Sequence, residues 1–134
     1  MNWAARLFRR LADQRLEPLG LSSGHLPVLT ALMESEPMSQ KALTERAAIE
    51  QPTMAATLGR MERDGIIERK PDPHDKRSFR FSLAPATRRK TVAIKAVIES
   101  MNVEALTSLP GKDQERFPEM LRKMILALEK AIDA

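Results

Sequence analysis

Two groups of polar side chains have the types and spacing needed to form hydrogen bonds with another molecule. In the first group, Thr53, Thr57 and Arg60 recur at intervals of four and three residues, and Gln51 precedes them. The second group is an unbroken run of four residues, His74, Asp75, Lys76 and Arg77. Hydroxyl, amide and guanidinium groups can hydrogen-bond base edges or phosphates. The two groups lie within two short helix patterns followed by two strand patterns, which is the order of a winged helix-turn-helix, so double-stranded DNA is the leading candidate partner.

The positive charge of the chain is concentrated around these two groups. Residues 39–90 contain 12 Lys and Arg against 7 Asp and Glu, whereas residues 1–38 carry 4 of each and residues 91–134 carry 6 basic and 7 acidic residues. The net charge of +4 is small, but a localised excess of +5 is typical of a protein that displaces counterions from phosphate. A solvated surface without a partner is the alternative.

The composition argues against several other functions. There is no cysteine, which excludes disulfides and thiolate metal sites, and the only two histidines, His25 and His74, lie far apart in the sequence. Without a glycine-rich phosphate loop or a metal-ligand cluster, we expect no enzyme site, no cofactor and no metal. No apolar run approaches the ~20 residues of a membrane span. We therefore expect a cytoplasmic protein with no membrane partner.

The first polar group lies on a predicted helix within a helix-turn-helix pattern. Ser39 is a suitable N-cap for a helix ending at Arg46, and residues 47–50 are short enough to form the turn into a helix over residues 51–64. Gly65 is the expected left-handed residue that ends it. The apolar stripe of this second helix consists of Met54, Leu58 and Met61. The same spacing turns the polar group outward.

The second polar group lies between two predicted strands. Phe79, Phe81 and Leu83 alternate with polar residues, which is the period of a strand with one buried face, and residues 66–70 are the expected partner strand. Residues 71–76 between them are rich in turn formers. The pattern therefore predicts a hairpin wing that presents the second group at its tip, and a winged helix-turn-helix over residues 21–83.

Amphipathic helices are predicted at both ends, over residues 2–18 and 85–134, with a break at Pro110-Gly111. Pro118 indicates that the last helix starts near it or bends there. We expect one domain over residues 1–134, mainly α with a small β-hairpin wing. The terminal helices carry more apolar surface than the winged part can cover, which favours a homodimer, with an intramolecular bundle as the alternative.

Six short segments, in this order and spacing, resemble the MarR-type bacterial transcriptional regulators over nearly the whole chain. They are Leu19-Gly-Leu-Ser22, Pro27-Val-Leu29, Ser39-Gln-Lys-Ala-Leu43, Glu50-Gln-Pro-Thr-Met54, Arg63-Asp-Gly65 and Asp72-Pro-His-Asp-Lys-Arg-Ser78. The resemblance implies a homodimer, joined by its terminal helices, that binds a pseudo-palindromic operator and usually represses.

The resemblance also implies roles for individual residues. The helix that begins at Gln51 would enter the major groove, and its predicted DNA contacts are Gln51, Thr53, Met54, Thr57 and Arg60. In the wing, Arg77 would reach the minor groove while Asp75 helps to fix the wing, with His74 and Lys76 beside them. Exposed charges of a helix face and a hairpin tip without DNA contacts are the alternative.

Two positions depart from the family pattern. Ala56 stands where relatives often place a larger polar residue, so readout there is limited to an apolar contact such as a thymine methyl. After the wing, Leu83-Ala-Pro-Ala-Thr87 replaces the Leu-Thr-x-x-Gly of many relatives, which weakens the expected cap of the next helix.

The resemblance also implies a possible small-molecule effector as a further partner, at the junction between the terminal helices and the winged part. Trp3 and His25 are the candidates there, because an indole and an imidazole can stack on or hydrogen-bond a small aromatic acid. Ordinary packing of both residues is the alternative. A second overall reading also stays open, in which the chain binds a ligand or a protein on this fold without specific DNA recognition.

Overall fold

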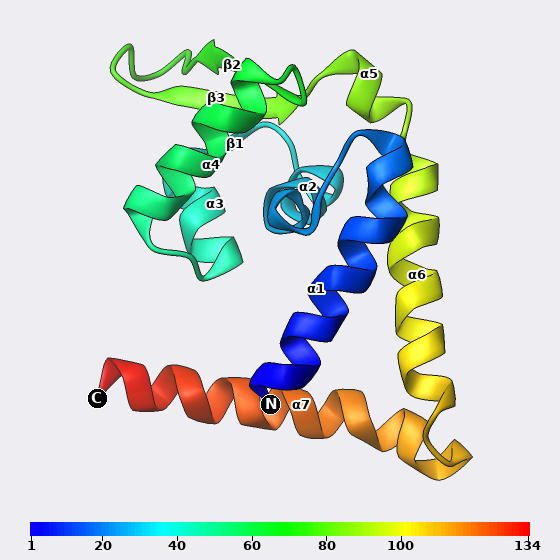
Figure 1. The fold of residues 1–134 in the computed structure, drawn as a ribbon. Helices are drawn as coiled ribbons and strands as arrows, with labels where there is room; N and C mark the ends of the chain where they lie inside the picture. The colour runs from blue at the N-terminus through cyan, green and yellow to red at the C-terminus, as the bar shows by residue number, and fades with distance from the viewer. The chain divides into compact units, whose positions relative to one another are not determined.

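The computed structural model describes all 134 residues, and the contacts within the chain divide it into two compact units, Met1–Val97 and Ile98–Ala134. The elements of the first unit are α1 (Asn2–Leu16), η1 (Glu17–Leu19), η2 (Ser23–His25), α2 (Leu26–Glu34), β1 (Met38–Ser39), α3 (Gln40–Ala47), α4 (Gln51–Arg63), β2 (Ile67–Pro71), β3 (Phe79–Leu83) and α5 (Pro85–Arg88) (Figure 1). The long helix α6 (Thr91–Thr107) runs from the first unit into the second, which ends with α7 (Gly111–Asp133). The predicted class, mainly α with a small β-hairpin, is confirmed.

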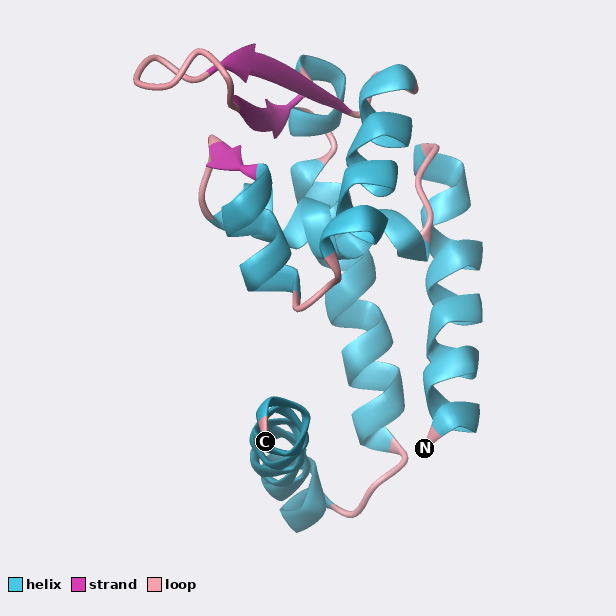
Figure 2. Ribbon diagram, turned by 90° about the vertical axis from the view of Figure 1, so that its left-hand side faces the viewer, coloured by secondary structure: helices cyan, strands magenta, loops and turns pink.

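The sheet of the first unit is antiparallel, with the strand order β1-β3-β2. β2 and β3 form the predicted hairpin, in which Ile67 lies opposite Leu83 and Pro71 opposite Phe79. Figure 2 shows the loop of this hairpin projecting beyond the neighbouring helices. The two-residue strand β1 was not predicted, because only its pairing with Phe81 and Arg80 distinguishes it from a loop.

One apolar core holds the winged part together. The core side chains come from α2, α3, α4 and the sheet, and are almost completely buried: Val28, Leu29, Leu32, Leu43, Met54, Leu58, Met61, Ile67, Phe81 and Leu83. Burying each of the larger ones contributes roughly 1.5–3 kcal/mol relative to leaving it in water. The core therefore fixes α4 and the base of the hairpin in one body.

Local signals place the helix boundaries in this unit. The Ser39 hydroxyl accepts a hydrogen bond from the Ala42 N–H at 3.1 Å, so the predicted N-cap of α3 is confirmed. The turn from α3 to α4 contains Ala48 in the left-handed region, with φ at 52°. Gly65, with φ at 74°, ends α4 as predicted. Pro52 occupies the second position of α4, where its missing N–H costs nothing.

Two helix boundaries and the burial of one residue differ from the sequence prediction. The first α-helix ends at Leu16 and continues as the 3-10 turn η1 through Leu19. The helix expected to follow Pro85 is divided into the short α5 and the long α6. Phe79, expected on the buried face of β3, is 38% exposed because it lies near the hairpin loop, beyond the residues that pair with β1.

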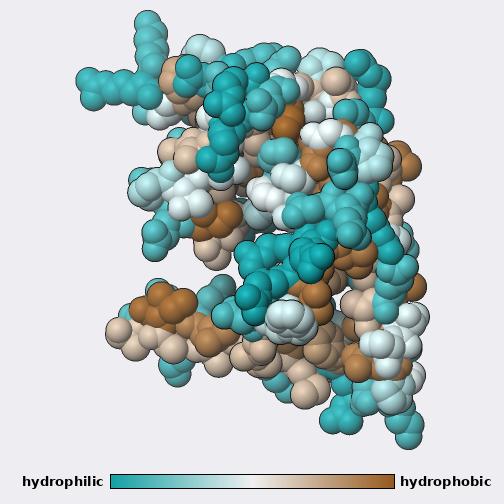
Figure 3. All heavy atoms as spheres, viewed as in Figure 1, coloured by the Kyte–Doolittle hydropathy of each residue, from teal (hydrophilic) through white to brown (hydrophobic).

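In the second unit, α7 begins at Gly111 after Pro110 and contains Pro118 within it, so of the two alternatives given for Pro118 the start of the helix is wrong. No residue of α7 is buried in the single chain. Apolar side chains gather along the C-terminal half of this helix (Figure 3). No helix of the structure combines the length and apolarity that crossing a membrane requires.

Candidate nucleic-acid interface

The helix α4 presents one polar face to solvent because its other face is locked into the core. Met54, Leu58 and Met61 are each at most 2% exposed. The helix is stopped by Gly65, and the Ile66 N–H returns to the Met61 carbonyl at 2.9 Å. These contacts leave α4 little freedom to rotate about its axis, so the core sets which side chains face outward.

The outward face carries most of the residues predicted from the sequence. Gln51, Thr53 and Arg60 are exposed and Thr57 is partly exposed. The Thr57 hydroxyl donates to the Thr53 carbonyl at 2.9 Å, so its oxygen lone pairs remain available to accept a hydrogen bond from a base. Thr53, Thr57 and Arg60 form a polar strip along one side of α4, and Gln51 is exposed at the start of the helix.

Met54 is not part of this strip. The side chain is completely buried, with 0% exposure, between α4 and the rest of the core. The prediction that Met54 contacts DNA is therefore wrong, because a thioether in this position cannot reach a groove without unfolding the helix. Its role is the one indicated by the i, i+4, i+7 spacing, which is to orient its polar neighbours.

The hairpin loop is organised by Asp75. Its carboxylate accepts a hydrogen bond from the Arg77 backbone N–H at 3.0 Å and another from the Ser78 hydroxyl at 3.1 Å, and its carbonyl accepts from the Ser78 N–H at 3.0 Å. Asp75 thus holds the backbone of the tip and leaves the Arg77 side chain exposed. His74 and Lys76 are exposed beside it, and Figure 3 shows hydrophilic side chains over this loop.

A second carboxylate, Asp72, closes the base of the loop. It accepts from the His74 N–H at 2.8 Å and from Arg80 Nε at 3.1 Å, while the Asp72 N–H donates to the Ser78 carbonyl at 2.9 Å. The hydrogen bond from His74 and the neighbouring Arg80 lower the pKa of Asp72 below its ordinary value of 3.8. The carboxylate is therefore charged at neutral pH, as the hydrogen bonds require.

One contact that the sequence did not predict connects the polar face of α4 to the hairpin. The guanidinium of Arg69 in β2 pairs with Glu62 of α4, with 3.1 Å between Nε and Oε2. The same group lies 4.3 Å from the centroid of the Phe79 ring in β3. Helix and hairpin are thereby joined at their polar surface as well as through the core.

The structure does not bring the two effector candidates together. His25 lies in η2, which packs against α4, whereas Trp3 is near the start of α1, 66% exposed, with the Arg6 guanidinium 5.2 Å from its ring centroid. Asp13 of α1 accepts the Ser23 N–H at 2.7 Å, so η2 adjoins the other end of α1. Ten residues of helix, roughly 15 Å, separate Trp3 from Asp13.

His25 is a structural acceptor in this position. Its Nδ1 accepts the Ser22 N–H at 3.1 Å and completes a capping box. Burial lowers the pKa of His25 below its ordinary value of 6.5, with Arg60 acting in the same direction and Asp64 and Asp13 opposing it. The imidazole is therefore neutral at pH 7. No group of three His, Asp or Glu side chains in the structure could hold a metal ion.

Comparison with known proteins places this arrangement in a family. The family model described as MarR family matches residues 19–78. The chain is 30% identical over 125 residues to an uncharacterized HTH-type transcriptional regulator, YwoH, of Bacillus subtilis, an alignment that covers 93% of this chain and 90% of the relative.

Solved structures agree with the fold. A probable transcriptional regulator from Pseudomonas aeruginosa is 27% identical with a TM-score of 0.82, covering 92% of each chain. The S. aureus MepR–DNA complex has a TM-score of 0.84 at 22% identity, covering 94% of this chain and 93% of that one. A MarR regulator from Methanosarcina mazei Go1 has a TM-score of 0.86 at 21% identity, covering 97% and 94%. The chain belongs to the MarR family of transcriptional regulators.

Proposed function

We propose that the protein is a repressor that binds a pseudo-palindromic operator in double-stranded DNA as a homodimer. Each protomer places α4 in the major groove and the tip of its wing, residues 72–78, against the adjacent minor groove. The two half-sites are spaced by about one helical turn, roughly 34 Å, as expected for a two-fold symmetric pair of recognition helices.

The observation that carries this proposal is the polar strip of α4, formed by Thr53, Thr57 and Arg60, together with Gln51 exposed at the start of the helix. These side chains supply donors and acceptors on a helix whose opposite face is fully buried. An α-helix fits the major groove, where each base pair presents a distinct pattern of donors and acceptors. A rigid helix with such a strip is suited to sequence recognition rather than to a general attraction to phosphate.

The wing supplies the second contact. The exposed Arg77 guanidinium stands on a loop whose backbone is fixed by Asp75. A guanidinium is attracted by the negative potential of a narrow minor groove. Lys76 and His74 beside it are placed to meet phosphates.

Dimerisation by the terminal helices is supported by apolar side chains that the single chain leaves exposed. In the first unit, α1 exposes Trp3, Leu7 and Phe8, at 66%, 44% and 40%. In the second unit, α7 exposes a stripe along its length: Phe117, Leu121, Met124, Leu128 and Ile132. Apolar surface of this extent is typical of protein interfaces.

Release of the operator by a small aromatic or anionic effector is part of the proposal. Because Trp3 is near the start of α1 and His25 lies beside the other end of that helix, an effector would use one of them and not both.

The S. aureus MepR–DNA complex is a structure of a protein of this fold with DNA. We propose no enzymatic activity for the chain.

The proposal is tested by selecting bound sequences from random duplex DNA at two salt concentrations. The wild-type chain should enrich one inverted repeat, and its affinity should fall steeply as salt rises. Arg77→Ala should weaken binding to that repeat about tenfold and make the affinity less dependent on salt, because one positive charge next to the DNA is lost. Arg9→Ala, which removes the same charge from exposed α1, is the matched control and should bind like the wild type.

Two results would contradict the proposal. Weak binding without enrichment of any sequence would favour a ligand- or protein-binding module on this fold. Equal losses for Arg77→Ala and Arg9→Ala would show that only the total charge matters and that the wing makes no specific contact.

A further inference from the structure

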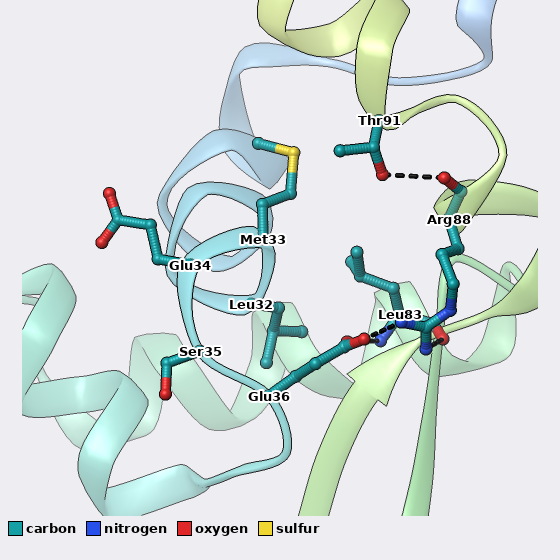
Figure 4. A pocket seen from close by; sticks show the side chains of 8 residues that line it. All are labelled: Leu32, Met33, Glu34, Ser35, Glu36, Leu83, Arg88 and Thr91. Atoms are coloured by element: carbon teal, nitrogen blue, oxygen red, sulfur yellow. Dashed lines mark hydrogen bonds and ion pairs between the residues drawn. The ribbon is translucent and has the colours of Figure 1, made fainter.

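The end of β3, where the wing joins the core, is completed by two side chains from other elements. The Leu83 N–H donates to Glu36 Oε2 at 2.8 Å, and the Leu83 carbonyl accepts from Arg88 Nη2 at 3.1 Å. Arg88 Nη1 also pairs with Glu36 Oε1. Figure 4 shows Glu36 and Arg88 meeting at Leu83 from the α2–β1 connection and from α5.

This pair takes the place of a missing strand residue. β1 pairs only with Phe81 and Arg80, so β3 has no neighbouring strand on that side at Leu83. The Ala84 N–H donates to the Ile66 carbonyl on the β2 side. Because the backbone N–H and C=O groups of successive strand residues point to alternate sides, those of Leu83 point away from β2. Glu36 provides the acceptor and Arg88 the donor that an added strand would provide.

The pair is held by hydrogen bonds rather than by tight packing. A cavity of about 530 Å³ lies beside it, lined by Leu32, Met33 and Ser35 among others. Leu83 itself is only 3% exposed, so its backbone groups depend on these two side chains rather than on water. A change of chemistry at Glu36 or Arg88 therefore removes contacts without creating a steric clash.

The pair lies at the base of the wing, where a small rotation of the hairpin moves its tip over a long distance. Arg77 is six residues from Leu83, up to roughly 20 Å along an extended strand. Glu36 connects to α2, and Arg88 is tied to the start of α6 because its carbonyl accepts the Thr91 hydroxyl at 2.8 Å. The pair thus fastens the base of the wing to helices on two sides.

We propose that Glu36 and Arg88 are positioning residues for DNA binding. They hold the base of the wing at the angle at which Arg77 reaches its groove while α4 occupies the neighbouring one. This inference rests on the proposed operator binding, and the pair acts through the wing rather than by touching DNA.

The first test is the affinity of full-length variants for the selected operator. The Leu83 N–H and Arg88 use different oxygens of the Glu36 carboxylate, so in Glu36→Gln one of these two donors faces the amide NH₂ instead of an acceptor. We expect about tenfold weaker binding for Glu36→Gln, for Arg88→Gln and for the double variant alike, because they break one unit. Glu34→Gln is the matched control, since it breaks the ion pair of Glu34 with Arg46 on exposed surface, and should bind within twofold of the wild type.

The second test separates positioning from a general loss of stability. In an Arg77→Ala background, Glu36→Gln should lower operator affinity less than twofold, because the wing contact is already absent. In a Thr57→Ala background, Glu36→Gln should still lower operator affinity about tenfold. Equal costs in both backgrounds, or wild-type affinity of Glu36→Gln, would overturn the inference.

Hydrogen exchange of the free protein distinguishes this inference from the proposed function. The Leu83 and wing amides should exchange faster in Glu36→Gln and Arg88→Gln than in the wild type, and unchanged in Glu34→Gln. Unchanged exchange in all variants would overturn the inference. If these variants exchanged faster but the wild type enriched no operator, the role of Glu36 and Arg88 in holding the wing would stand and the proposed operator binding would be refuted.

Discussion

The helix α4 and the tip of the wing present their exposed polar side chains in different ways. α4 is positioned by apolar burial, with Met54, Leu58 and Met61 at most 2% exposed. The tip of the wing has no apolar anchor and is shaped by the carboxylates of Asp72 and Asp75, through hydrogen bonds on the protein surface. One element shares the stability of the core, and the other has its own local organisation.

This difference determines what each element can do without unfolding the protein. The orientation of α4 changes only if the core opens, which costs most of the free energy of unfolding. The wing can loosen or shift when a few polar contacts are exchanged. The protein therefore combines a rigid helix with an adjustable wing, and substitutions in the two regions should separate stability from affinity.

The largest effect is expected from the core side of α4. Met54→Ala should lower the free energy of unfolding by about 2–5 kcal/mol, because it leaves a cavity where a completely buried side chain was. Urea unfolding followed by far-UV circular dichroism, at one fixed protein concentration, measures the change.

The neighbouring Thr53 provides the control for Met54→Ala. Thr53→Ala changes an exposed residue of the same helix and should alter stability by about 0.5 kcal/mol or less. A Met54→Ala variant as stable as Thr53→Ala would show that the core does not fix α4, and the contrast with the wing would be lost.

The sequence predicted α4 well because local patterns determine it. Its apolar spacing, the left-handed Gly65 and the Ser39 cap of the preceding helix are each visible within a few residues, and each is confirmed. The same spacing argues against Met54 as a DNA contact. The family resemblance predicted this contact from the position of Met54 in the helix, and the burial of its side chain shows that the prediction is wrong.

Contacts between distant residues could not be predicted in this way. Glu36 and Arg88 are 52 residues apart, and β1 exists only because Met38 and Ser39 lie opposite β3. The pairing of Glu62 with Arg69 likewise depends on how the hairpin packs on α4. Such contacts leave no period in the sequence, so the hairpin was predicted but the contacts that attach it to the helices required the structure.

A smaller effect, on affinity and not on stability, is expected from Asp75. Asp75→Ala removes the acceptor for the Arg77 N–H and the Ser78 hydroxyl, so the tip loses its fixed backbone. We expect operator affinity to fall about tenfold, or about 1.4 kcal/mol, while the free energy of unfolding changes by about 0.5 kcal/mol or less. Fluorescence anisotropy with the selected operator gives the affinity.

The charge change of Asp75→Ala has to be separated from the loss of its hydrogen bonds. Removing a carboxylate near phosphates raises affinity for any DNA, so the informative quantity is the ratio of operator to random-duplex binding. Asp75→Asn keeps one acceptor oxygen and should lose less of that ratio. A loss of global stability comparable to that of Met54→Ala would show that the wing is part of the core.

The smallest expected effect is a change of stability with pH, and it comes from His25, which lies in η2 next to α4. Because burial lowers the pKa of His25 below 6.5, the unfolded chain takes up a proton over a pH range in which the folded chain does not. Stability should therefore decrease as the pH falls through 6.5 and level off once the pH is below the folded-state pKa. The effect is modest because the imidazole is only partly buried.

A substitution isolates this contribution. His25→Asn retains an acceptor for the Ser22 N–H but does not titrate, so its stability should vary less between pH 8 and pH 5 than that of the wild type. His74→Asn changes the only other histidine, on the exposed wing, and should keep the wild-type profile. If His74→Asn instead reduced the change of stability with pH, the histidine responsible would lie on the wing and not beside α4.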